Sequence, residues 1–167
     1  IRIKGREIGK LNAKDLRALR AKEIGMVFQS VALLPGRTGL ENAAFGLEVQ
    51  GIEKSERLRI ATEALTKVGL AEWRNRYPRE LSGGMQQRVG LARALASDPG
   101  IILMDEPFSA LDPLIRKQLQ DEFRQPAKSL GKSAVFITHD LDEAIRIGDR
   151  IAIMKDGVII QAGIAEE

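Results

Sequence analysis

Three short apolar segments each end at residues that can move a proton or bind a metal ion. The segments and residues are 24–28 with Gln29, 101–104 with Asp105 and Glu106, and 134–138 with His139. In open α/β sheets, ligands bind beyond the carboxyl ends of the strands, so these groups could meet at one site. A single Gln or His there more often stabilises a loop, so the interpretation rests on all three segments.

Asp105 and Glu106 are the most informative pair. An apolar strand that ends in Asp is the Walker B arrangement, in which the carboxylate holds Mg²⁺ on a nucleotide. Adjacent residues of an extended strand point to opposite faces, so Glu106 is interpreted as a separately aimed base or orienter for an attacking water. The alternative is an acidic loop that caps a helix. It suits Asp112, which precedes Pro113, better than Asp105.

The segment 81–88 places two glycines, Gly83 and Gly84, at the predicted start of a helix. Exposed N–H groups and the positive end of the helix dipole favour anions there, and Ser82 could donate to a phosphate. The alternative is that Ser82 only caps the helix.

Residues 5–11 contain Gly-x-x-x-Gly-Lys-Leu, which is one residue shorter than a phosphate-binding loop. Leu11 also stands where such a loop has Ser or Thr to bind Mg²⁺. We interpret Gly9-Lys10 as a turn, so the chain contains no phosphate-cradling loop.

The apolar patterns predict strands that alternate with helices. Strands are expected at 1–4, 24–28, 101–104 and 134–138, and as a hairpin, 151–155 with 158–161, around Asp156-Gly157. Helices are expected at 11–21, after a Thr38–Glu41 capping box, from the candidate N-cap Ser55 to Gly69, after Ser82, at 113–123 and at 141–147. This order predicts an α/β layered sheet with crossover connections, into which the helical block 31–97 is inserted.

Composition excludes several classes of protein. The 167 residues are 44% hydrophobic and 29% charged, which is ordinary for a globular chain of one or two small domains. The absence of Cys excludes disulfides, thiol catalysis and cysteine–zinc sites, and it suits a reducing compartment such as the cytoplasm. No apolar run reaches the ~20 residues that span a bilayer. The net charge of +3 does not indicate nucleic acid binding. The chain begins at Ile1 inside a strand-like pattern, so an upstream segment is expected.

Five motifs, in matching order and separation, resemble those of ABC-type ATPases. They are Gln29 as the Q-loop, 81–86 as the signature, 101–107 as Walker B, 109–112 as the D-loop and 137–140 with the switch histidine. Segments 37–42, 112–116 and 140–149 are further similar to the ATP-binding subunits of glycine betaine/proline-type quaternary amine importers. Gly36 and Gly39 depart from that pattern, because the subfamily commonly carries larger side chains there, and Pro126 departs from it by interrupting a helix.

This resemblance implies a partial P-loop NTPase (RecA-like) layered sheet. Residues 1–30 and 98–167 would belong to the ATP-binding core, and residues 31–97 would form a helical signature subdomain. The implied cofactors are ATP and Mg²⁺. The implied roles are Asp105 and Gln29 at the metal, Glu106 polarising water, Gln29 sensing metal or water, His139 contacting the γ-phosphate, and Ser82, Gly83, Gly84, Gln86 and Asp112 binding nucleotide.

The resemblance also implies partners. A second copy would bind head-to-tail, and permease subunits would dock on residues 30–50, so the protein would lie peripherally at the cytoplasmic face of the cell membrane. A substrate-binding protein would act indirectly, and no nucleic acid partner is implied. The P-loop and the aromatic residue that stacks on adenine would precede Ile1, so the chain as given is expected to be inactive.

Three alternatives stay open. The protein could serve an importer for another small solute such as an amino acid, or it could be a soluble ABC protein that acts on nucleic acid or ribosomes. It could also be a non-enzymatic interaction module. The sequence does not identify the transported solute.

Overall fold

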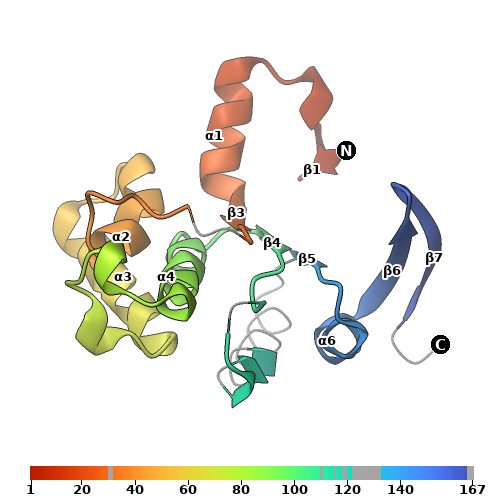
Figure 1. The fold of residues 1–167 in the computed structure, drawn as a ribbon. Coiled ribbons are helices and arrows are strands. Elements are labelled where there is room, and N and C mark those ends of the chain that lie inside the picture. The colour runs from red at the N-terminus through yellow and green to blue at the C-terminus, as the bar shows by residue number, and fades with distance from the viewer. Residues whose placement is uncertain (30–31, 110, 115, 118–119, 122–132, 165–167) are drawn as a thin grey trace.

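A three-stranded parallel sheet lies at the centre of the molecule (Figure 1). The computed structural model describes residues 1–29, 32–109, 111–114, 116–117, 120–121 and 133–164. The sheet consists of β3 (Ile24–Val27), β4 (Ile101–Asp105) and β5 (Ser133–Ile137), in the order β3-β4-β5. Val27 pairs with Met104, and Met104 with Phe136, so the three strands end side by side. The expected α/β sheet with crossover connections is confirmed.

Three helices stand between β3 and β4 in the sequence and lie together at one side of the sheet in Figure 1. They are α2 (Gly39–Val49), α3 (Lys54–Lys67) and α4 (Gly83–Ala96), with 3-10 turns η2 (Ala71–Trp73) and η3 (Pro78–Glu80) before α4. Each pair of these helices is in contact. Their buried residues, Leu65 and Leu91 among them, belong to the same hydrophobic cluster as Val27 and Met104 of the sheet. Burial of this shared cluster fixes α4 against the strands.

The start of α2 is fixed by side-chain hydrogen bonds. The predicted capping box is confirmed, since Thr38 accepts the Glu41 N–H and the Glu41 carboxylate accepts the Thr38 N–H. Asn42 is fully buried, and its Oδ1 accepts the Leu34 N–H at 2.8 Å. Its Nδ2 donates to the carbonyl oxygens of Leu34, Arg37 and Thr38. The loop before α2 is therefore held by one amide side chain.

The start of α3 differs from the prediction that Ser55 is its N-cap. The N-cap is Glu53, whose carboxylate accepts the N–H groups of Ser55 and Glu56. The longer acidic side chain reaches the free N–H groups from an earlier position, so the helix begins before Ser55. At the other end, Gly69 has a φ of 71°, as expected for a glycine just past a helix.

The N-terminal segment forms a small antiparallel pair, a 3-10 turn and one helix. These elements are β1 (Arg2–Ile3), β2 (Arg6–Glu7), η1 (Ile8–Lys10) and α1 (Ala13–Glu23). The strand expected at 1–4 thus covers only two residues. Gln50, which follows α2, donates from Nε2 to the Ala21 carbonyl oxygen at 3.1 Å, so α1 is tied to the helical block.

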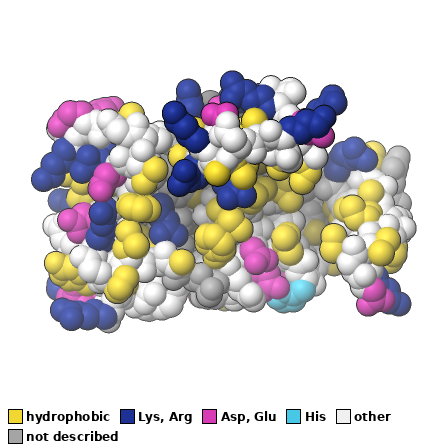
Figure 2. All heavy atoms as spheres, turned by 90° about the horizontal axis from the view of Figure 1, so that it is seen from above, with side chains coloured by type: hydrophobic (Ala, Val, Ile, Leu, Met, Phe, Trp, Pro, Cys, Tyr) yellow, Lys and Arg dark blue, Asp and Glu magenta, His cyan; other side chains and the backbone are white. Residues whose placement is uncertain are grey.

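The C-terminal segment continues from β5 into α6 (Leu141–Ile147), with the predicted bounds. It then forms an antiparallel hairpin of β6 (Arg150–Lys155) and β7 (Val158–Ile164). Asp156 and Gly157 have φ of 51° and 78°, the left-handed pair that a two-residue hairpin turn requires, so the predicted hairpin is confirmed. Its apolar side chains are exposed, with Met154 at 66% and Ile160 at 61%. In Figure 2, hydrophobic side chains are visible at the surface at the right-hand end of the molecule, where the hairpin lies.

Residues 113–114, 116–117 and 120–121 are helical, in agreement with the helix expected after Asp112. The predictions that involve Ser30, Ala110, Phe123 and Pro126 fall on residues outside the described part of the chain. Within the described part, every helix is too short or too polar to cross a bilayer.

Candidate functional site

Gln29, Glu106 and His139 meet at the carboxyl edge of the sheet. Gln29 Nε2 donates to Glu106 Oε2 at 2.9 Å, and His139 Nδ1 lies 2.9 Å from Glu106 Oε1. These residues follow β3, β4 and β5, whose parallel register brings their ends to one edge. The predicted convergence of the three strand ends is therefore confirmed. Glu106 stands at its centre because each of its carboxylate oxygens has its own partner.

Glu106 lies beyond the end of β4 and has a left-handed backbone, with a φ of 44°. That conformation is unfavourable for a side chain other than Gly, by about 1–3 kcal/mol. It is held by the Glu106 N–H, which donates to the Ile137 carbonyl oxygen at 2.9 Å, and by the Glu106 carbonyl oxygen, which accepts the Ser109 hydroxyl at 2.9 Å. The carboxylate is therefore aimed by a turn in the backbone rather than by the alternation of strand faces that the sequence analysis assumed.

The electrostatics of this site centre on His139, whose side chain is 75% exposed. The hydrogen bond that protonated His139 donates to Glu106, together with the negative charge of Glu106, raises the pKa of His139 above its ordinary value, and Asp140 and Glu143 raise it further. At pH values below the ordinary His pKa of about 6.5, the imidazolium–carboxylate pair stabilises the fold. This contribution is lost as the pH rises through the raised pKa of His139, and solvent screens it because the ring is exposed.

A titration of His139 should show this shift directly. His139 is the only histidine of the chain, so its imidazole NMR signals are unique. We expect a pKa above about 6.5 in the unmodified chain, and a pKa closer to 6.5 in Glu106→Gln, which removes the charge of the principal partner. Replacing the exposed Asp142 by Asn is the matched control. Equal pKa values in Glu106→Gln and the unmodified chain would contradict the ion pair.

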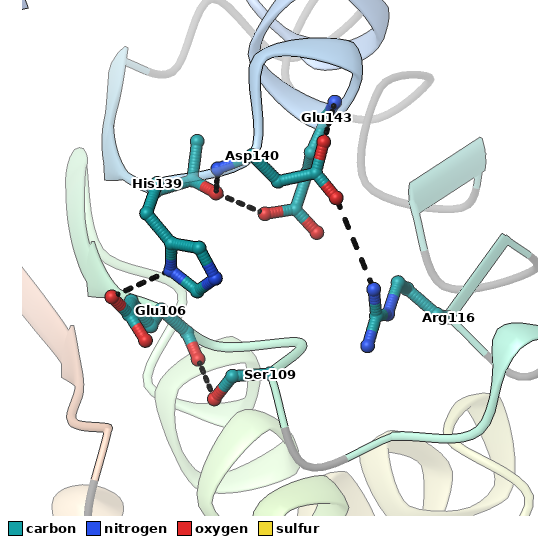
Figure 3. A pocket seen from close by; sticks show the side chains of 7 residues that line it. Glu106, Ser109, Arg116, His139, Asp140 and Glu143 are labelled. Carbon is teal, nitrogen blue, oxygen red and sulfur yellow. Dashed lines mark hydrogen bonds and ion pairs between the residues drawn. The ribbon is translucent and has the colours of Figure 1, made fainter.

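A small polar pocket of about 70 Å³ opens beside His139 (Figure 3). Its lining residues are Glu106, Ser109, Arg116, Thr138, His139, Asp140 and Glu143. Of these, the sequence analysis assigned site roles only to Glu106 and His139. Glu143 could have been found as the acidic residue three positions after the helix N-cap Asp140, which is the spacing of a capping motif. No local sequence pattern identifies Arg116 as a site residue, because it reaches the pocket only in the folded chain.

Asp105 is the last residue of β4, half-buried and paired with Ile137 of β5. The described residues contain no group of three or more His, Cys, Asp or Glu side chains that could hold a metal ion by themselves. Mg²⁺ binds proteins through one or two carboxylates and completes its shell with waters and substrate phosphates. A single carboxylate at this position is therefore compatible with Mg²⁺ delivered with a nucleotide.

Ser82 caps α4, because its Oγ accepts the Met85 N–H at 3.3 Å. Ser82 and Gly83 are exposed. A Cβ added at Gly83 would meet no other atom within 4 Å, so packing within this chain does not require a glycine there. Gln86 donates from Nε2 to the carbonyl oxygens of Pro78 and Leu81 and so fixes the loop before the helix. The helix start is thus held by side-chain hydrogen bonds and is exposed at Ser82 and Gly83.

Asp112, which the sequence analysis expects to bind nucleotide, and Gln87, which it does not, both lie outside the pocket lining. Asp112 is exposed, and its carbonyl oxygen accepts the Arg116 N–H at 2.9 Å. Gln87 is buried and donates from Nε2 to the Pro107 carbonyl oxygen at 2.9 Å. The sequence analysis gave Gln87 no role, although this bond joins the first turns of α4 to the residue that follows Glu106.

This chain is similar in sequence to known proteins of transporters. The family model described as ABC transporter matches residues 1–109. The glycine betaine transport ATP-binding protein OpuAA of Bacillus subtilis is 59% identical over 167 residues, which are 100% of this chain and 40% of that protein. The glycine betaine/proline betaine transport system ATP-binding protein ProV of Escherichia coli is 56% identical over 99% of this chain and 41% of its own length. The chain thus spans about two fifths of the length of these curated relatives.

A solved structure gives the corresponding likeness in fold. The dimeric ATP-binding cassette MJ0796, in a post-hydrolysis state bound to ADP and Pi, aligns with a TM-score of 0.92 and 35% sequence identity. The alignment covers 98% of this chain and 72% of that chain. The expected partial P-loop NTPase fold is therefore confirmed.

Proposed function

This chain belongs to the ABC transporter family, and from that membership we propose that its full-length protein is the ATP-binding and ATP-hydrolysing subunit of an importer for quaternary amines. The observation that carries the proposal is the convergence of Gln29, Glu106 and His139 at one sheet edge, where Asp105 ends β4. Glycine betaine is the solute named for two of the relatives, which supports the class of solute.

In the proposed reaction, Glu106 accepts the proton of the water that attacks the γ-phosphate. Phosphoryl transfer relies mainly on positioning and electrostatic stabilisation, so the aimed carboxylate is the main chemical contribution of the chain. Asp105 and Gln29 would hold Mg²⁺, which neutralises charge on the β- and γ-phosphates when bound. His139 would donate to a γ-phosphate oxygen, a contact favoured by its raised pKa.

The hydrogen bonds around Glu106 leave room for this reaction. Gln29 donates to one carboxylate oxygen, and His139 contacts the other. A carboxylate has about four lone-pair sites, so each oxygen can also accept a hydrogen bond from a water molecule. The two partners therefore orient the carboxylate and leave it able to accept a proton.

The phosphate-binding loop would come from a part of the full-length protein outside the present sequence. The fragment 5–11 lacks the required spacing and the Ser or Thr. The solved cassette that shares the fold is longer than the aligned region, since the alignment covers 72% of it. Residues 1–30 and 98–167 would therefore form part of the ATP-binding core, and residues 31–97 the helical signature subdomain.

A second copy would complete the site from the outside. The exposed start of α4 has a glycine, Gly83, that its own chain does not require, which supports close approach by a nucleotide held on another subunit. Ser82, Gly83, Gly84 and Gln86 would make that approach, with Asp112 nearby in the dimer. The aligned structures of MJ0796 are described as dimeric, which supports this arrangement.

The remaining partners follow from the proposed transport role. Permease subunits would dock on the helical block around residues 30–50, with a substrate-binding protein acting indirectly, and the subunit would lie at the cytoplasmic face of the membrane. The helical block carries an ion-pair cluster around Glu48. Glu48 Oε2 lies 2.9 Å from Arg37 Nη1 and 3.5 Å from Arg57 Nη2.

A comparison of chain lengths tests the proposed activity. The purified full-length protein should hydrolyse ATP in the presence of Mg²⁺. The 167-residue chain should show no turnover above its own Asp105→Ala variant, because it lacks the loop and Lys that hold the β- and γ-phosphates. Phosphate release is the measurement. An inactive full-length protein, or fragment turnover that Asp105→Ala removes, would each contradict the proposal.

A further inference from the structure

Glu143 is a buried carboxylate in the pocket beside His139. It lies in the first turn of α6 and is 8% exposed. Each of its oxygens accepts one hydrogen bond, from Thr138 Oγ1 to Oε2 at 2.6 Å and from Gln120 Nε2 to Oε1 at 2.8 Å. Burial of a carboxylate is unfavourable unless its oxygens are paired, so the fold keeps both partners in place.

The Thr138 hydroxyl closes the backbone around His139. While it donates to Glu143, it also accepts the Asp140 N–H at 3.0 Å. Asp140 Oδ1 in turn accepts the Glu143 N–H at 3.2 Å. His139 is the single residue between the two clamped positions, and Figure 3 shows its ring pointing from this loop toward Glu106. The position of the ring therefore depends on the hydroxyl that Glu143 holds.

The other oxygen of Glu143 reaches the helical segment that follows Asp112. Gln120 belongs to this segment and is itself buried, at 5% exposure. Two charged contacts join the same segment to the loop and to α6. Arg116 Nη1 lies 4.0 Å from Asp140 Oδ2, and Arg146 Nη2 lies 3.1 Å from Asp121 Oδ1. Glu143 and Gln120 are the buried members of this connection, where solvent screens the charge of Glu143 least.

We propose that Glu143 is a positioning residue that holds His139 against Glu106 through the Thr138 hydroxyl and ties this arrangement to the segment that follows Asp112. Its effect on rate rests on the proposed ATP hydrolysis, whereas its effect on the His139 ring does not. The competing account is that Glu143 only stabilises the start of α6. In that account, its loss lowers stability and leaves His139 unchanged in the folded protein.

The first test uses two uncharged replacements of Thr138 in the full-length protein. Thr138→Val keeps the shape and removes the hydroxyl, while Thr138→Ser keeps the hydroxyl. The NMR signal of His139 is identified by its absence in His139→Asn. Positioning predicts that Thr138→Val lowers the pKa of His139 toward its ordinary value, because the ring leaves Glu106 more often, and that Thr138→Ser does not. Equal titration curves in the two variants would overturn the proposal.

The second test separates the effect of side-chain length from the effect of charge at Glu143. Glu143→Asp keeps the charge and is one methylene too short, whereas Glu143→Gln keeps the length and can still pair with Thr138 and Gln120. We expect Glu143→Asp to lower kcat on the order of 10- to 100-fold with little change in KM for ATP, and Glu143→Gln to lower it less. The exposed Asp142→Asn on the same helix is the control.

The reverse order, or rates in both variants equal to that of Asp142→Asn, would overturn positioning. If Glu143→Asp fails to fold, the Thr138 pair decides the question. If the full-length protein hydrolyses no ATP in any form, the proposed function fails, and the NMR comparison still decides whether the Thr138 hydroxyl, which donates to Glu143, positions His139.

Discussion

Replacing Glu106 by Gln in the full-length protein should lower the rate of ATP hydrolysis by about 10²-fold or more while ATP binding is retained. The amide has the shape of the carboxylate but cannot accept a proton from water. It can also accept from only one of the two present partners, Gln29 or His139, so the amide is expected to turn its oxygen toward one of them. Steady-state hydrolysis and nucleotide binding are measured on the same preparation.

Asp105→Asn is the matched variant one residue away. It should weaken Mg²⁺-dependent nucleotide binding, because an amide oxygen is a poorer ligand for this hard cation than a carboxylate. The two neighbouring variants therefore have different signatures, one in turnover at saturating ATP and the other in affinity. If both lose nucleotide affinity to the same extent, the separate roles of Asp105 and Glu106 are wrong.

The second large effect is expected at Ser82. Ser82→Arg in the full-length protein should abolish hydrolysis, because a long side chain at the exposed start of α4 blocks a nucleotide approaching from another subunit. A variant of the P-loop Lys should also be inactive. Mixed dimers of the two variants place both lesions at one composite site and leave the other intact, so we expect hydrolysis to return in the mixture.

The hydrolysis rate of folded Ser82→Ala separates this role from helix capping. Ser82 does cap α4, so Ser82→Ala should cost about 1 kcal/mol of unfolding free energy whichever account holds. Only the nucleotide-binding account also predicts a lower rate in folded Ser82→Ala. A mixture that stays inactive, with heterodimers demonstrated and no nucleotide trapped at the intact site, would contradict the head-to-tail arrangement. Trapped nucleotide without turnover would mean that the two sites must act together.

The convergence of Gln29, Glu106 and His139 could be predicted from sequence because each follows an apolar segment of strand length. Strands separated by helices run parallel, and parallel strands bring their carboxyl ends to one edge. The capping box at Thr38 and the hairpin turn at Asp156-Gly157 were predictable for a similar reason, since both are decided by residues close in sequence.

Contacts between residues that are distant along the chain could not be predicted from the sequence. The left-handed backbone of Glu106 is held by hydrogen bonds with Ile137 and Ser109. No local sequence pattern predicts this conformation. Gln120 and Glu143 are 23 positions apart and meet only in the folded chain. The N-cap of α3 shows a different limit, because Ser55 and Glu53 both satisfy the chemistry of a cap and the fold decides between them.

The hairpin of β6 and β7 bears on the colloidal behaviour of the chain. Its exposed apolar residues, Met154 and Ile160 among them, sit on a two-stranded sheet whose outer edges pair with no further strand among the described residues. Apolar strands with open edges are templates for intermolecular pairing. The 167-residue chain should therefore self-associate through this hairpin as its concentration rises. A polar replacement at Ile160 would be the first change to try in preparing soluble samples for spectroscopy.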